Sequence, residues 1–269
     1  LIEKRPFLGG RAFSFHDPEV GCEVDNGQHV FMGCCTYYLD FLKTVDAADK
    51  TFLQDRLNVD VCLDGVSGTL SSAPMLGPFH LLPSFVRYPH LGLIDKLLAA
   101  YGLMRIRLAD RHKRAKALDG QTLYDWLRRH HQTERAIDHL WNLIILPTMN
   151  DDIRSVSADM GLMVLQEGLL NGPGDATLGY SRVGLTSLTG APAQKSIESR
   201  GGTLVLGKSV RSLNVEGGEV NGVELSDARV LRADAYVSAL PFDALLEVLP
   251  QEVANDDFLS SAAQLTSSP

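Results

Sequence analysis

The chain has 269 residues, of which 45% are hydrophobic and 22% are charged, the composition of an ordinary globular protein. Its formal net charge is -8 at pH 7, whereas a nucleic-acid-binding domain normally carries a basic patch, so we expect no nucleic-acid partner. The four cysteines form no Cys-x-x-Cys pair, which predicts a reduced, cytoplasmic chain without a metal site. No uncharged apolar run reaches the roughly 20 residues that a transmembrane helix needs.

The first third of the chain has the pattern of short strands and tight loops. Leu1 to Glu3 resembles the end of a strand, and strand-like residues follow at 12–15 and 23–31 around the turn signal Asn26-Gly27. Residues 37–45 then have helical spacing. Because the chain opens on the end of a strand and Ala262 to Pro269 completes no element, we expect it to be the interior of a longer protein, truncated at both ends.

The middle of the chain is predicted to be mainly helical. Prolines punctuate an apolar stretch after residue 74, and helices are predicted at 91–116, 122–131, 133–146 and 157–169. Residues 79–116 have two interpretations that both stay open. They form either an apolar tunnel wall with a basic rim that rests on an anionic membrane, or a cap helix with a solvated basic end.

The last third returns to strands. A helix is predicted at 191–200, ending at Gly201-Gly202, and strands at 203–206, 210–215, 219–225, 229–231 and 236–239. Gly217-Gly218 and Ser226-Asp227 have the composition of hairpin turns. Strands on both sides of a helical insert predict a discontinuous sheet domain.

The sharpest local motif is the run from Glu3 to Arg11. An acidic residue that ends the second strand of a Rossmann unit is placed to bind the hydroxyls of an adenosine ribose. The pair Gly9-Gly10 lets the backbone approach a diphosphate, and Arg11 can give that diphosphate charge-assisted hydrogen bonds. The motif therefore predicts a dinucleotide cofactor.

The pattern Glu-x-Arg-x-x-x-Gly-Gly-Arg over residues 3–11 resembles the second-strand signature of the flavin amine oxidase and phytoene desaturase superfamily. The segment from Asp25 to Phe31 narrows the resemblance to the bacterial hydroxysqualene dehydroxylase family, also called squalene-associated FAD-dependent desaturases. Segments at 33–42, 141–147, 178–188, 201–210 and 233–249 continue it in the expected order. One departure is Asp227-Ala228, where a glycine is usual in the turn.

This resemblance implies an α/β fold, in which a Rossmann-type FAD-binding domain is interrupted by a mainly helical substrate domain. The FAD-binding domain would comprise residues 1–74 and 191–269, and the substrate domain, which would face a membrane, residues 75–190. The residues expected to hold FAD are Glu3 and Arg5 at the ribose, Gly10 and Arg11 at the diphosphate, Gln28 and His29 toward the isoalloxazine ring, and the backbone of Val210 at adenine. No catalytic residue is assigned, although Asp25 and His29 could also be interpreted as an acid–base pair.

The reaction implied by the resemblance is removal of the allylic hydroxyl of hydroxysqualene to give squalene. The expected partner is a polyisoprenoid substrate, with contact at the inner face of the membrane. Three alternatives stay open: a carotenoid or phytoene-type desaturase, another flavin amine oxidase-like enzyme, and a non-catalytic lipid-binding remnant.

Overall fold

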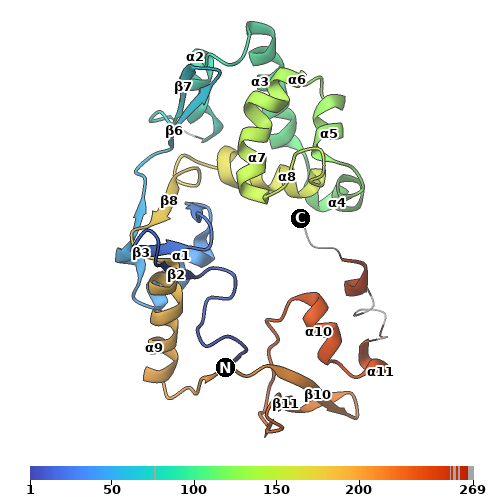
Figure 1. Cartoon of the computed structure of the whole chain (residues 1–269). Helices are drawn as coiled ribbons and strands as arrows, with labels where there is room; N and C mark the ends of the chain where they lie inside the picture. Colours follow the sequence, from blue (N-terminus) through green and yellow to red (C-terminus); the bar gives the residue numbers. More distant parts are fainter. Residues whose placement is uncertain (76, 255, 257–258, 260, 266–269) are drawn as a thin grey trace. The chain divides into compact units, whose positions relative to one another are not determined.

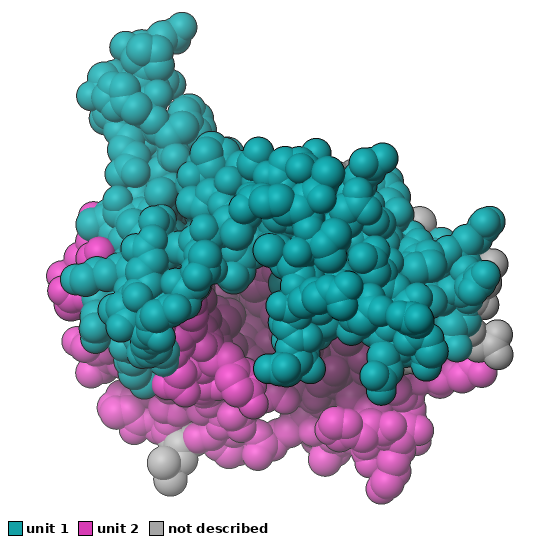
Figure 2. All heavy atoms as spheres, turned by 90° about the horizontal axis from the view of Figure 1, so that it is seen from below, with its two compact units in different colours: residues 1–28, 42–47, 183–267 teal, residues 29–41, 48–182, 268–269 magenta. Residues whose placement is uncertain are grey.

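The computed structural model describes residues 1–75, 77–254, 256, 259 and 261–265 (Figure 1). The chain forms two compact units, coloured separately in Figure 2. Unit 1 contains residues 1–28, 42–47 and the described residues from 183 onward, and unit 2 contains residues 29–41 and 48–182. Helix α1 (Thr36–Thr44), the predicted helix at 37–45, passes from unit 2 into unit 1.

Unit 1 combines a parallel strand pair, two antiparallel sheets and several short helical elements. Its strands are β1 (Ile2–Glu3), β2 (Ser14–Asp17), β3 (Cys22–Asp25), β9 (Val205–Leu206), β10 (Val210–Glu216), β11 (Glu219–Leu225) and β12 (Val230–Leu231). Its helical elements are η5 (Thr186–Gly190), α9 (Ala191–Ser199), α10 (Phe242–Val248), α11 (Gln251–Ala254) and η6 (Ser261–Gln264). β1 pairs in parallel with β9, whereas β2–β3 and β10–β11–β12 are antiparallel.

The turns of unit 1 follow from its glycines. Gly217 and Gly218 both have positive φ, at 63° and 84°, and connect β10 to β11 as predicted. The β2–β3 hairpin closes at Gly21 (φ 67°), while Asn26-Gly27 separates β3 from β4. In the turn between β11 and β12, Ala228 adopts a φ of 64°, the left-handed region that favours glycine.

The predicted strand at 236–239 is wrong. None of the described strands pairs with these residues, and the side chain of Val237 is 97% exposed. A strand needs a hydrogen-bonded neighbour for its backbone N–H and C=O groups, so an alternating pattern alone does not make one. Of the terminal residues 262–269, the first three lie in η6, and 266–269 lie outside the described residues.

Unit 2 is a helical layer with two small antiparallel sheets. Its strands are β4 (Val30–Met32), β5 (Thr51–Leu53), β6 (Asn58–Leu63), β7 (Val66–Ser71) and β8 (Leu178–Ser181), paired as β4–β8–β5 and β6–β7. Its helical elements are η1 (Ala48–Lys50), η2 (Gly77–Leu81), α2 (Leu82–Arg87), α3 (Leu93–Leu108), α4 (Arg111–Asp119), α5 (Leu123–Arg129), α6 (Glu134–Ala136), η3 (Ile137–Trp141), α7 (Asn142–Met149), α8 (Ala158–Leu165) and η4 (Gln166–Leu170).

The helix predicted at 91–116 is two helices, so its continuity was predicted wrongly. Ala109 leaves the helical conformation, and the carboxylate of Asp110 accepts a hydrogen bond from the Lys113 N–H, which starts α4. The other predicted helices are confirmed with small shifts. The segment predicted at 133–146 is helical from 134 to 149 through a π-helical turn, η3.

The core of unit 2 explains why these helices are stable together. Trp141, Leu123, Leu127 and Leu162 are fully buried in one cluster, and Trp141 donates its indole N–H to Gln132 Oε1 at 3.0 Å. Packing of apolar faces supplies most of the stability of helices this short. Among the described residues, no helix combines the length and the apolar character needed to cross a bilayer.

Candidate functional site

The candidate site begins where β1 ends. β1 and β9 run in parallel, with Ile2 opposite Val205 and Glu3 opposite Leu206, so both strands finish at the same edge. The Glu3 carbonyl accepts the N–H of Lys208 at 3.2 Å, and the Arg5 carbonyl accepts the N–H of Gly207 at 3.0 Å. Ligands of open α/β sheets bind at the carboxyl ends of parallel strands, and Glu3 stands at such an end.

The Glu3 carboxylate is half-buried and only partly used by the protein. Its Oε1 accepts the backbone N–H of Arg5 at 2.8 Å, which fixes the side chain beside the strand end. No other described residue donates a hydrogen bond to this carboxylate. Oε2 therefore remains an acceptor for a ligand hydroxyl, as a ribose diol requires.

The glycine loop that follows has a conformation that other residues rarely adopt. Gly9 has a φ of 122°, and a Cβ at this position would lie 2.6 Å from the Ala12 carbonyl oxygen. Gly10 has a φ of 58° and nothing within 4 Å of its missing Cβ. The backbone at Gly10 is therefore open to a ligand, which matches a position that approaches a diphosphate.

The two arginines of the motif have different surroundings. Arg5 donates from Nη1 to the Gly10 carbonyl at 3.0 Å, and its guanidinium lies 4.9 Å from the ring centroid of Phe13, so it holds the loop in place. Arg11 is exposed, and none of the described acidic side chains forms an ion pair with it. A free guanidinium beside an open glycine backbone suits a diphosphate, so the residues from Glu3 to Arg11 fit the nucleotide part of FAD.

The remaining predicted residues have fewer contacts with the loop from Glu3 to Arg11. Val210 starts β10, two residues after Lys208, whose N–H reaches the Glu3 carbonyl. Gln28 is the last residue of the first segment of unit 1 and His29 is the first residue of unit 2, and both are exposed. Their position beside the isoalloxazine ring, and the role of Val210 at adenine, stay predictions.

A hydrogen-bond network around Asp25 was not predicted from the sequence. Oδ1 of Asp25 accepts from Ser14 Oγ at 2.7 Å and from the backbone N–H of Leu185 at 3.0 Å, and Ser14 Oγ also accepts the N–H of Thr186 at 3.2 Å. The residue before this helix, Gly184, has no side chain that could cap it. The contacts from Asp25 and Ser14 instead give the first N–H groups of the helix, which starts at Leu185, their acceptors.

No local signal could have revealed this cap, because Asp25 and Leu185 are 160 residues apart. A carboxylate at a helix N-terminus also interacts favourably with the helix dipole. The interpretation of Asp25 as an acid–base partner of His29 stays a prediction, whereas its contacts give it a structural role.

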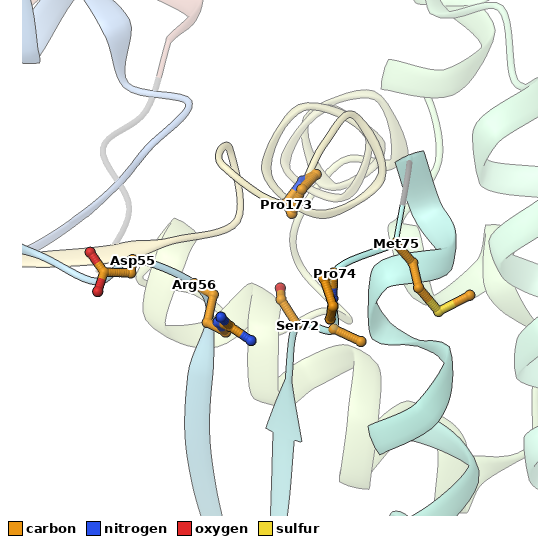
Figure 3. Close-up of a pocket in the computed structure, with 7 residues that line it drawn as sticks. Asp55, Arg56, Ser72, Pro74, Met75 and Pro173 are labelled. Atoms are coloured by element: carbon orange, nitrogen blue, oxygen red, sulfur yellow. The ribbon is translucent and has the colours of Figure 1, made fainter.

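Unit 2 contains a pocket of about 320 Å³ (Figure 3). Its lining comes from three segments of the chain: Asp55 and Arg56, Ser72 to Met75, and Pro173. Alanine, proline and methionine side chains form most of the wall, which is therefore mainly apolar. The two charged lining residues, Asp55 and Arg56, lie on the segment that leads into β6.

Ser72 connects this pocket to a buried histidine. The Nε2 atom of His80 lies 2.9 Å from the Leu169 carbonyl, which only accepts, so Nε2 carries the proton. Nδ1 therefore accepts from Ser72 Oγ at 2.7 Å. Both nitrogens of this fully buried ring have partners, and these two contacts fix Ser72 and η2 against the end of η4.

Cys34, the first of the two adjacent cysteines after β4, is not poised as a nucleophile. Burial, with a smaller contribution from Cys35, raises the pKa of the Cys34 thiol to about 11, so Cys34 is protonated at neutral pH. Within the part of the chain that the structure describes, no group of three or more His, Cys, Asp or Glu side chains could hold a metal ion.

The chain is similar in sequence to enzymes of known activity. The chain is 28% identical over 269 residues to the zeta-carotene desaturase of Zea mays, covering 94% of this chain and 47% of that protein. It is 23% identical over 267 residues to the hydroxysqualene dehydroxylase of Zymomonas mobilis, covering 96% of this chain and 60% of that protein. The chain thus spans about half the length of these relatives.

A solved structure shows the same fold. An oxidoreductase from Methanosarcina mazei superposes with a TM-score of 0.64 and 16% sequence identity, over 98% of this chain and 58% of that one. This likeness confirms the predicted α/β fold class. All residues, 1–269, match the family described as flavin containing amine oxidoreductase, which confirms the predicted FAD cofactor. The chain therefore belongs to the flavin containing amine oxidoreductase family.

Proposed function

We propose that the complete protein is an FAD-dependent oxidoreductase that removes the allylic hydroxyl of hydroxysqualene to give squalene. The observation that carries the cofactor part is the half-satisfied Glu3 carboxylate at the end of a parallel strand, followed by the open backbone of Gly10 and the unpaired Arg11. The substrate part is supported by the segment from Asp25 to Phe31 and by the relative from Zymomonas mobilis.

The residues of this chain would bind and orient the cofactor. Glu3 would accept from the ribose hydroxyls while its other oxygen keeps the Arg5 N–H. Arg11 and the N–H groups of the glycine loop would hold the diphosphate, and the Arg5 bond to the Gly10 carbonyl would keep that loop in shape. Gln28 and His29 would lie toward the flavin ring, and the Val210 backbone would pair with adenine.

The proposed reaction needs one proton and one hydride for each hydroxyl removed as water. When bound in its reduced form, FAD supplies the hydride, and an external reductant must reduce it again. The protein would bind the polyisoprenoid in an apolar environment and exclude water from it, with specificity set by length and shape. In this proposal the FAD-binding domain comprises residues 1–74 and 191–269, and the substrate domain residues 75–190.

A carotenoid desaturase is the second candidate function. It is favoured by the relative from Zea mays, whose identity of 28% exceeds the 23% of the dehydroxylase. The scaffold would be the same, but the cofactor would take hydride from the substrate instead of giving it. The dehydroxylase ranks first here because the segment from Asp25 to Phe31 resembles that family.

The test is a visible absorbance spectrum of the complete purified protein, followed by anaerobic reaction of the reduced protein with hydroxysqualene. We expect a bound-flavin spectrum, and we expect one squalene to form for each flavin that is reoxidised. Bound flavin without squalene would refute the dehydroxylase, and conversion of a carotene by the oxidised protein would then establish the desaturase. Absence of flavin would refute the cofactor assignment to Glu3 and Arg11, and it would support a non-catalytic lipid-binding protein.

A further inference from the structure

Helix α3 presents an apolar stripe to solvent. Leu93, Leu97 and Leu108 are 76%, 64% and 70% exposed, and Ile94 and Met104 are exposed as well. Successive residues of an α-helix are about 100° apart, so these five side chains lie within an arc of about 100°. Apolar stripes of this width normally face a core, whereas this helix packs on its core through its opposite side.

The opposite side of α3 shows that the orientation is fixed. Ala99 and Ile106 are fully buried there, and a Cβ on Gly102 would lie 2.8 Å from the Gln132 side chain. Gln132 donates to the Leu98 carbonyl at 2.7 Å, which holds the helix against the core. The helix cannot rotate to bury its stripe without losing this packing, so within unit 2 the stripe stays exposed.

Helix α2 and the turn before it expose apolar side chains of their own. Phe79, Leu82 and Val86 are exposed, and Lys96 on α3 donates from Nζ to the Val86 carbonyl at 2.7 Å. This bond ties the end of α2 to the start of α3. The exposed apolar side chains of the two helices are called the α2–α3 surface below: Phe79, Leu82, Val86, Leu93, Ile94, Leu97, Met104 and Leu108.

The charges around the α2–α3 surface are positive in a protein that is negative overall. Residues 82–116 contain eight Lys and Arg against two Asp, while the whole chain has a net charge of -8. On the helical projection, Arg105 lies just beyond one edge of the stripe and Arg107 just beyond the other. Some of these charges are already paired: Arg111 forms an ion pair with Asp159 at 3.1 Å, and Lys113 pairs with Asp110 at 3.2 Å. Asp95 accepts from Thr133 Oγ1 at 2.7 Å, while Arg105 is exposed beside the stripe.

We propose that the α2–α3 surface docks on the interface of an anionic lipid bilayer. Exposed leucines between flanking arginines match such an interface, because the acyl chains take the apolar side chains and the lipid phosphates take the cations. A second copy of this chain fits less well, since it would bring two basic rims together. The proposal stands on exposure and charge and does not depend on the proposed reaction, although a membrane would also supply a polyisoprenoid.

The first test is co-sedimentation of the complete protein with vesicles of phosphatidylcholine containing phosphatidylglycerol, and with vesicles of phosphatidylcholine alone. We expect binding to the anionic vesicles that weakens with salt. The double substitution Leu97→Gln with Leu108→Gln should weaken this binding at least tenfold. The control is Val237→Gln, which changes an even more exposed apolar side chain in unit 1 and should leave binding unchanged.

The second test places a reporter in the stripe. In Leu97→Trp, the new indole should shift its emission to shorter wavelength with anionic vesicles and be quenched by brominated lipid. Equal vesicle binding by the wild type and the double variant would overturn the proposal, as would no binding to either vesicle. So would sedimentation velocity showing a wild-type dimer that the double variant loses. The bound-flavin spectrum of each sample is recorded separately, so loss of membrane binding and failure of the flavin assignment are distinguished.

Discussion

Replacing Glu3 with glutamine should weaken FAD binding without unfolding the protein. Glutamine keeps an oxygen that can accept the Arg5 N–H, now held at 2.8 Å, but it loses the charge and puts an NH₂ group where Oε2 would accept a ribose hydroxyl. A hydrogen bond to a charged group contributes about 1.5–3 kcal/mol. Because each 1.4 kcal/mol is about tenfold in affinity, FAD should bind roughly 10- to 150-fold more weakly.

The assay is fluorescence titration of the flavin-free complete protein with FAD and, in parallel, with FMN. FMN lacks the adenosine, so its affinity should be the same for the wild type and for Glu3→Gln. The matched control is Glu219→Gln, which changes an exposed carboxylate on the β10–β11 hairpin and should leave the affinity for FAD unchanged. A loss of less than twofold, or an equal loss for FMN, would refute the assignment of Glu3 to the adenosine ribose.

Four further predictions concern stability and are checked by chemical or thermal unfolding. Gly9→Ala should cost about 1–3 kcal/mol because its Cβ would meet the Ala12 carbonyl at a φ of 122°, and Gly10→Ala, in open space, should cost less. Ala228→Gly should stabilise by about 0.5–1 kcal/mol by relieving a φ of 64°; a loss would contradict this. Asp25→Ala should cost about 1–3 kcal/mol by leaving a helix N–H without its acceptor, and Asp25→Asn should restore most of it. Burial lowers the pKa of His130 below 6.5, so protonation favours the unfolded chain. The thermal midpoint should therefore fall as the pH drops below about 6.5, and it should fall less steeply in His130→Gln. An unchanged slope in this variant would disprove the role of His130.

The sequence by itself determined the features that depend on a few neighbouring residues. The acid at a strand end followed by Gly9-Gly10-Arg11 predicted the loop conformation, because positive φ angles are accessible mainly to glycine. The same reason made the Gly217-Gly218 turn predictable, and it makes Ala228 unusual at its position. The α/β class followed from the family resemblance carried by residues 3–11, and the order of strands and helices along the chain agreed with it.

Only the tertiary structure decided contacts between distant segments. The cap that Asp25 gives to the helix at Leu185, and the pinning of His80 by Ser72 and the Leu169 carbonyl, depend on where the chain returns in space. The strand predicted at 236–239 was wrong for a related reason, since strand formation requires a partner that an alternating pattern does not supply. The sequence pattern likewise predicted a helix in the region of α3. Which of its apolar side chains are buried depended on packing against Gln132 and the core, and that packing leaves Leu97 and Leu108 exposed to solvent.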